Sequence, residues 1–277
     1  MPSINHQMTE IYVFIDDYLK AHPTRANWRR SPNDAPEFAD AEVLTIALRQ
    51  GCFGCATLKK TYELVANNYR TAFPHVCSYQ QWRQRLHALS TLVEQLLDAA
   101  RTVNGFDCAF YLVDSKPIPV CKAIRHGRVR SLREAGAYFG KSSGGWFFGF
   151  KLHVLRHVSG RVVNPILTPA NWDDREAALA LALAADGGVV LGDLGYRGPK
   201  AAELLAQEAD ILLLTRADAP EKRALLSSAR QRVETLFSQL WQQFIDRVFS
   251  RSWHGLWNTI KLKLLHYNLC HAGILSI

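Results

Sequence analysis

Short apolar runs of strand length dominate the sequence after Asp107 and constrain the fold more than any other feature. Five such runs are CAFYLV, GGWFFGFKLHVL, GRVVNPILT, GGVVLG and DILLLT, and their β-branched and aromatic residues favour strands. Ser159-Gly160 supplies turn chemistry between the second and third runs, which predicts a hairpin. Segments between the later runs, NWDDREAALALALAA and RGPKAAELLAQ, have helical patterns,. This order predicts an α/β domain built on a mixed sheet flanked by helices.

The chain before residue 106 has helical periodicity instead. Between Ile11 and about Arg101 the apolar residues recur at helical spacing, and one stripe consists of Trp82, Leu86, Leu89, Val93 and Leu96,. We therefore expect a small all-helical domain over residues 1–105, followed by the α/β domain over residues 106–277. The basic side chains of the helical part suit phosphate contacts, and an ordinary solvated helical surface accounts for them equally well.

The overall charge narrows the class of partner. The formal net charge is +8 and the isoelectric point is about 9.3, which favours a polyanion, either nucleic acid or an acidic membrane surface. No apolar run approaches the ~20 residues of a membrane span, and the N-terminal segment lacks the basic start and apolar centre of a signal peptide. Six cysteines without such a signal fit free thiols better than disulfides,. We therefore expect a cytoplasmic protein without a membrane partner.

Two apolar runs end at an aspartate, since CAFYLV runs into Asp114 and GGVVLG into Asp193. Because ligands of open α/β sheets bind where strands end, the two carboxylates are expected to meet there. Glu234 lies beside the apolar stripe of an amphipathic helix, EKRALLSSARQRVETLFSQLWQQF, one turn after Arg230,. Three converging carboxylates repel one another unless a hard cation such as Mg²⁺ binds them. Two such ions support phosphoryl transfer.

Each acid also has an ordinary structural interpretation. An aspartate after a strand is commonly a turn residue or a helix cap, and Arg230 with Glu234 can form an ion pair one turn apart on a helix. Either aspartate alone would favour that interpretation. The combination of all three acids in a basic protein favours the metal site.

Five segments occur together in an order that resembles the DDE transposases of bacterial insertion sequences: YLVDSKPIPVC, GWFFGFKLHVL, LTPANWDD, LGDLGYRG and RVETLFSQLWQQF. The resemblance covers about Phe38 to the C-terminus. It implies a ribonuclease H-like core whose catalytic and metal-binding triad falls on Asp114, Asp193 and Glu234, at spacings of 79 and 41 residues. The expected cofactor is Mg²⁺, as two ions, for which Mn²⁺ can substitute.

The sequence departs from the family's pattern around the third acid. Related transposases often carry a Tyr, Arg, Glu and Lys signature there. Arg230 and Glu234 match it, whereas Ser227 and Trp241 stand at the Tyr and Lys positions. The missing lysine removes one expected contact with the transposon end and leaves the triad intact.

Basic residues concentrate beside the first acid. Between Ser115 and Arg161 the chain carries ten Lys or Arg residues and one acid, a net charge of +9 that exceeds the +8 of the whole chain. The glycine-rich residues 121–145 are expected to form a flexible loop that binds the phosphate backbone. The expected DNA-binding residues are Lys116, Lys122, Arg125, Arg128, Arg130, Lys141, Lys151, Arg197, Arg230, Arg232, Arg247 and Arg251. Lys151 and His153 alternate along a strand and share a face, which points toward DNA or, for His153, equally well into the core.

These expectations combine into a transposase. The resemblance implies metal-dependent cleavage at transposon ends and transfer of the freed 3′-hydroxyl into target DNA, and we expect residues 1–105 to bind DNA. Binding two ends implies at least a homodimer in the synaptic complex, and we expect a nucleoid-associated location. Two alternatives are a metal-dependent nuclease without strand transfer and a non-catalytic DNA-binding protein derived from a transposase. The intact acids disfavour the second alternative.

Overall fold

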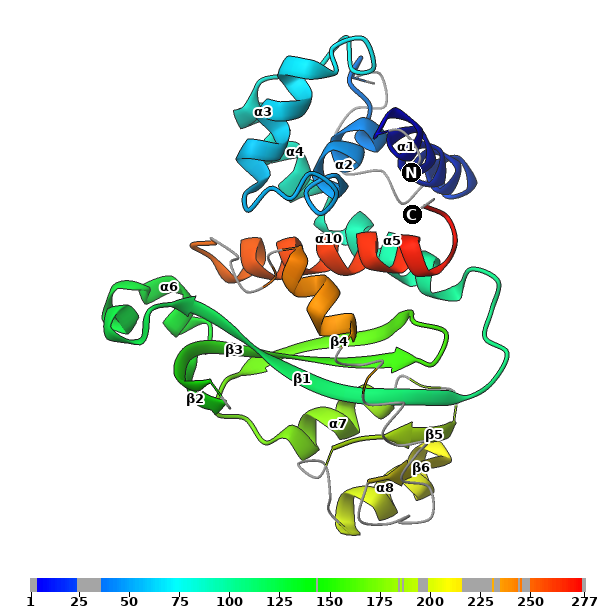
Figure 1. The fold of residues 1–277 in the computed structure, drawn as a ribbon, viewed down its shortest axis with the longest axis vertical. Coiled ribbons are helices and arrows are strands. Elements are labelled where there is room, and N and C mark those ends of the chain that lie inside the picture. Colours follow the sequence, from blue (N-terminus) through cyan, green and yellow to red (C-terminus); the bar gives the residue numbers. More distant parts are fainter. Residues whose placement is uncertain are drawn as a thin grey trace. The chain divides into compact units, whose positions relative to one another are not determined.

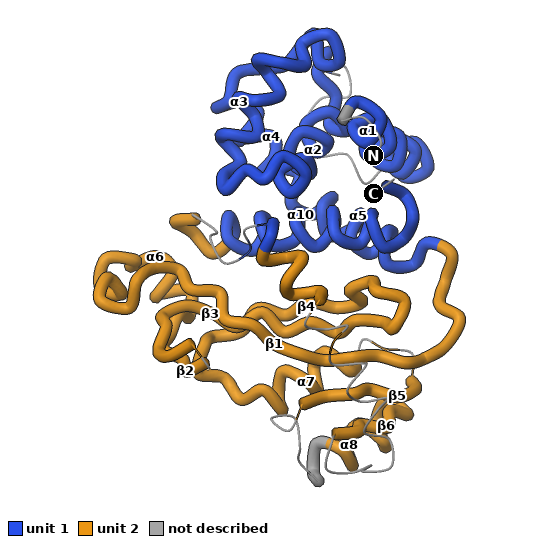
Figure 2. Tube along the Cα trace, viewed as in Figure 1, with its two compact units in different colours: residues 1–103, 242–248, 254–277 blue, residues 104–241, 249–253 orange. Residues whose placement is uncertain are grey.

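The structure, a computed structural model of the 277-residue chain, divides into two compact units. It describes residues 4–23, 36–142, 144–183, 185, 187–193, 199–215, 231, 235–243, 245 and 250–275. Unit 1 comprises Met1–Val103, Gln242–Val248 and His254–Ile277, and unit 2 comprises Asn104–Trp241 and Phe249–Trp253 (Figure 2). Among the described residues, no helix is both long enough and apolar enough to cross a membrane.

The described part of unit 1 consists of helices and their connections. The helices are α1 (Ile4–Ala21), α2 (Asp40–Leu48), α3 (Leu58–Asn68), α4 (Tyr79–Ala88), α5 (Ser90–Thr102) and α10 (Trp253–His271), of which only Trp253 belongs to unit 2. The predicted apolar stripe from Trp82 to Leu96 is buried. It is shared by two helices, because α4 ends before Leu89 and α5 begins after it. The indole nitrogen of Trp82 donates to the carbonyl oxygen of Val43 at 3.1 Å, which fixes α4 against α2.

The C-terminal helix α10 differs from the predicted division at residue 106. The sequence placed all of residues 106–277 in one domain, whereas His254–Ile277 cluster with unit 1. Lys261 of α10 donates to Glu94 of α5 at 2.6 Å, and His266 contacts the sulfur of Cys52 at 2.8 Å. Apolar residues occur on all sides of α10, so its periodicity gave no sign of which unit it joins,.

Unit 2 is a mixed α/β unit built on a six-stranded sheet (Figure 1). The strands are β1 (Phe110–Cys121), β2 (Tyr138–Ser142), β3 (Gly145–His157), β4 (Val162–Pro169), β5 (Gly188–Leu191) and β6 (Ile211–Leu214). The strand order is β2-β3-β1-β5-β6, and β4 pairs with β3. β1, β2 and β4 each run antiparallel to β3, whereas β5 runs parallel to both β1 and β6. The predicted mixed sheet and the hairpin through Ser159-Gly160 are therefore present.

One face of the sheet packs against helices α7 (Asp174–Ala182) and α8 (Pro199–Ala209) (Figure 1). Its apolar cluster joins Tyr111 and Val113 of β1 to Leu181 of α7 and Leu205 of α8. Side chains alternate along a strand. Leu112 and Asp114 alternate with Tyr111 and Val113 along β1, so their side chains lie on the opposite face of the sheet.

Residues 121–145 are more ordered than the flexible loop that the sequence predicted. They contain the 3₁₀ helix η2 (Ala123–Arg128), the short helix α6 (Arg130–Glu134) and β2. The ring of His126 packs against Phe139 and Phe148, with centroids 5.0 and 5.7 Å away, and Leu132 is buried. These isolated apolar contacts anchor the segment without producing a periodic pattern in the sequence.

Gly188 begins β5 and is expected to tolerate no side chain. Its φ is +102°, and a Cβ there would lie 2.2 Å from the carbonyl oxygen of Ala109, next to β1. Gly188→Ala is therefore expected to lower the free energy of unfolding by at least about 2 kcal/mol. Chemical denaturation measures this. Gly105→Ala is the control, because Gly105 has φ +63° but open space around the Cβ position, and about 1 kcal/mol is expected there. Equal losses in the two variants would contradict the steric explanation.

Candidate active site

The register of β1 and β5 places Asp114 and Asp193 at equivalent positions. The last pair of the parallel ladder is Leu112 with Leu191, and each aspartate follows two residues later in its own chain. Neighbouring strands lie about 4.8 Å apart. Two residues beyond a common pair, the aspartates are therefore expected to lie side by side and on one face.

The sequence suggested that Asp114 ends its strand, but in the structure it lies inside β1. β1 continues to Cys121, and Asp114 lies opposite Val154 of β3. The Asp114 side chain is half-buried, and its Oδ1 accepts the backbone N–H of Ser115 at 2.8 Å. Asp193 is exposed. Asp114 therefore lies on the sheet face opposite α7 and α8, and Asp193, which solvent reaches, is expected on the same face,.

The third predicted acid, Glu234, lies outside the described residues. So do Arg197, Arg230, Arg232 and Arg247. The described residues that follow Glu234 are helical from 235 to 242, and Phe237 is buried. The Nζ atom of Lys116 lies 5.7 Å from the centroid of the Phe237 ring. Lys116 is two residues after Asp114 on the same face of β1, so this helix approaches the face that carries the aspartates.

Comparison with known proteins identifies the family. Residues 105–246 match the family described as transposase DDE domain. The chain belongs to this family. No curated protein sequence matches it. The matched residues include β1, β5 and the helical segment after Glu234, and therefore both Asp114 and Asp193.

The transposase DDE domain keeps Lys151 and His153 on the face away from Asp114. Both lie on the side of β3 that carries Leu155, a member of the cluster with α7,. Lys151 forms an ion pair with Asp174 at the start of α7, with Nζ and Oδ1 2.7 Å apart. His153 is fully buried, and its Nε2 lies 2.9 Å from the hydroxyl of Thr168. The structure thus decides the alternative for His153 in favour of the core.

Buried His153 is expected to make stability fall in acid. Burial lowers the pKa of His153 to about 4, and its Nδ1 has no hydrogen-bond partner among the described residues. Between about pH 6.5 and 4 the unfolded chain takes up this proton and the folded chain does not, so stability is lost as pH falls through that window. From pH 7 to pH 5 the loss from this group is about 2 kcal/mol. Denaturant unfolding of the wild type and of His153→Gln at both pH values measures it. An equal loss in the variant would exclude His153 as the source.

The basic residues of the transposase DDE domain differ in burial. Arg156 and Arg161 are buried and bind backbone carbonyl oxygens, those of Gly160 and Gly105, so they hold the fold. Six basic residues of the segment 122–141 are exposed: Lys122, Arg125, Arg128, Arg130, Arg133 and Lys141. Arg130 of this group pairs with Glu134 at 2.9 Å. Arg251 of unit 2 is exposed as well. The charge available to an anion thus comes mainly from η2 and its neighbours.

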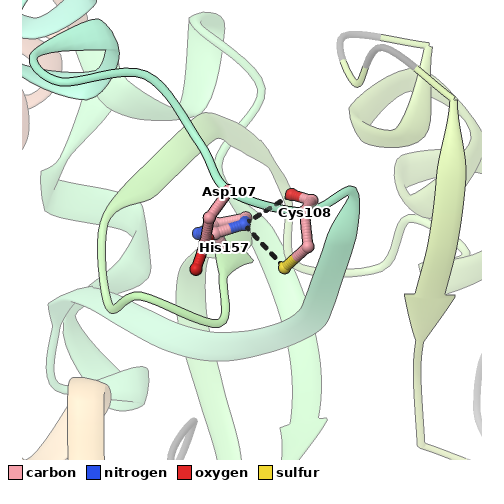
Figure 3. A group of neighbouring side chains, drawn as sticks. All are labelled: Asp107, Cys108 and His157. Atoms are coloured by element: carbon pink, nitrogen blue, oxygen red, sulfur yellow. Dashed lines mark hydrogen bonds between the residues drawn. The ribbon is translucent and has the colours of Figure 1, made fainter.

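A second group of side chains of metal-binding type lies near the start of β1. Figure 3 shows Asp107, Cys108 and His157, whose ligand atoms lie within 4.8 Å of one another. His157 Nε2 donates to the carbonyl oxygen of Cys108 at 2.8 Å, and its Nδ1 accepts the backbone N–H of Ser159 at 3.1 Å. Burial lowers the pKa of His157. Because both nitrogens of the neutral His157 ring form hydrogen bonds, the ring has a structural role. We therefore favour Asp114 and Asp193 over this group as the candidate metal ligands.

Proposed function

We propose that this chain is a transposase that cuts DNA at transposon ends and joins the freed 3′-hydroxyl to target DNA. The observation that carries the proposal is the parallel ladder of β1 and β5, whose last pair lies two residues before Asp114 and Asp193, in a protein of the transposase DDE domain family. Adjacent carboxylates are the hard oxygen ligands that Mg²⁺ prefers. Their repulsion without a cation gives a physical reason for a metal at this position.

Each residue of the proposed triad has a separate task. Asp114 would hold the cations from the central strand β1, and Asp193 would hold them from the segment just after β5. Glu234 would add the third carboxylate, a role proposed from the family resemblance and supported by the contact of Phe237 with Lys116. Two Mg²⁺ ions, or Mn²⁺ in their place, would activate the attacking oxygen and stabilise the leaving oxygen. The side chains hold these positions and orient the scissile phosphate.

The arrangement of strands supports a ribonuclease H-like core for this chemistry. β1 is the central strand. On one side it pairs antiparallel with β3, which in turn pairs antiparallel with β4, and on the other side β5 and β6 run parallel to it. The exposed cations of η2 would contact the phosphate backbone. Unit 1 would read the transposon ends, and two protein chains would hold two ends in the synaptic complex. DNA binding would place the protein at the nucleoid.

A single assay separates this proposal from its two alternatives. The protein is incubated with Mg²⁺, a labelled duplex that carries the flanking ends of its own gene, and a supercoiled target plasmid. A transposase gives both cleaved ends and ends joined to the plasmid. A nuclease gives cleavage alone, and a non-catalytic DNA-binding protein gives a complex without cleavage. Pre-cleaved ends test the joining step by itself, so absence of joined products with these ends would overturn the proposal.

A further inference from the structure

Trp146 is the most exposed aromatic side chain among the described residues. It lies at the start of β3 with 68% of its surface exposed. Its cross-strand partner is Lys141 of β2, which is also exposed. An exposed indole leaves a large apolar ring in water. A cation directly beside it adds affinity for an anionic partner, so the pair combines a flat apolar surface with a positive charge.

The positive charge around Trp146 extends onto η2. Phe148 follows Trp146 on the same face of β3 and pairs with Phe139 of β2,. The ring of His126 packs on both phenylalanines. His126 belongs to η2, so this aromatic contact anchors the 3₁₀ helix on the face that carries Trp146. The exposed cations of η2 and its flank are Lys122, Arg125 and Arg128.

This aromatic and basic surface lies on the same sheet face as Asp114. Val154 is the cross-strand partner of Asp114, and Trp146 is eight residues before it in β3. An even spacing keeps the two side chains on one face, about 26 Å apart along the strand. That length corresponds to roughly eight nucleotides of a B-form strand. A DNA strand whose phosphate lies at the aspartates therefore reaches Trp146 within one turn of helix.

We propose that Trp146 is a stacking platform for an unpaired DNA base, flanked by Lys141 and by the cations of η2 as phosphate contacts. Inside a duplex the faces of the bases are covered by their neighbours, so the base that stacks on the indole is an unpaired one. The basic side chains alone would bind the phosphates of any duplex. The exposed indole adds a preference for DNA with single-stranded nucleotides. The proposal rests on the proposed function only in taking DNA as the ligand.

The experiment compares two DNA probes on the full chain without catalytic metal. One probe is a blunt 20-base-pair duplex, and the other has the same sequence with a single-stranded 3′ tail that carries 2-aminopurine. The wild type is expected to bind the tailed probe more tightly and to quench the 2-aminopurine. Trp146→Ala is expected to lose about 5- to 150-fold in affinity for the tailed probe, the range of one stacking contact. Its affinity for the blunt duplex should be unchanged, and Trp146→Phe should retain most of the preference.

Tyr138→Ala is the matched control. Tyr138 is 56% exposed on the same hairpin, but it pairs with Gly149 and so faces the other side of the sheet,. It should keep the tail preference of the wild type. A tail preference that survives in Trp146→Ala, or that is absent from the wild type, would overturn this inference alone, since blunt-duplex binding and Mg²⁺-dependent cleavage test the proposed function separately. Thermal unfolding of all variants excludes misfolding.

Discussion

Asp114→Asn is expected to abolish metal-dependent cleavage and strand transfer while DNA binding persists. The amide keeps the volume and one carbonyl oxygen but removes the negative charge that the proposed metal-binding role requires. Loss of a metal ligand removes several kcal/mol of transition-state stabilisation, so activity should fall roughly a thousand-fold or more. Product formation from labelled ends measures cleavage, and a gel shift measures binding on the same preparation.

The stability of the Asn variant separates a metal site from a structural role. The Asn carbonyl oxygen can still accept the N–H of Ser115, which Asp114 Oδ1 accepts at 2.8 Å. Loss of the charge relieves repulsion with Asp193. The melting temperature without metal should therefore stay equal or rise slightly. An active but destabilised variant would show that Asp114 is only a structural residue.

Asp107→Asn is the matched control for this substitution. Asp107 is an exposed aspartate just before β1, in the group with Cys108 and His157. Because both nitrogens of His157 are engaged in hydrogen bonds, this group is not expected to hold the catalytic ions. Asp107→Asn should retain cleavage. Loss of activity in this variant, with Asp114→Asn active, would move the metal to the group in Figure 3.

The strands could be predicted from their apolar composition, but the end of β1 could not. The sequence predicted that this strand ends at Val113, because the residues that follow include polar side chains and two prolines, Pro117 and Pro119. In the structure these residues continue β1, after its ladder with β5 has ended at Leu112. Beyond that pair β1 needs hydrogen bonds on the β3 side only. Proline is tolerated on such an edge because it lacks only a donor that the edge does not use.

For the site residues too, the sequence pattern indicated some positions and not others. Asp114 and Asp193 could be proposed as site residues because an apolar run before a single acid is a local signal, and the parallel ladder of β1 and β5 ends two residues before each of them. Trp146 gave no such signal, since the run GGWFFGF has the composition of a core strand. Trp146 lies next to the first residue of β3, in the hairpin with β2, and on the face opposite α7 and α8,.

Arg125→Gln with Arg128→Gln is expected to weaken binding of duplex DNA about ten- to a hundredfold at moderate salt. Both arginines are exposed on η2, which His126 anchors on the Asp114 face of the sheet, and neither side chain forms an ion pair within the described residues. Removing one phosphate interaction lowers the slope of log affinity against log salt by about one, so the slope of the double variant should fall by about two. A salt titration of binding measures the slope.

Ala206→Glu with Gln207→Glu is the matched control. It makes the same change in net charge at exposed positions of α8, which covers the other face of the sheet, and should leave the slope nearly unchanged. Equal slopes in both double variants and the wild type would remove η2 from the DNA interface.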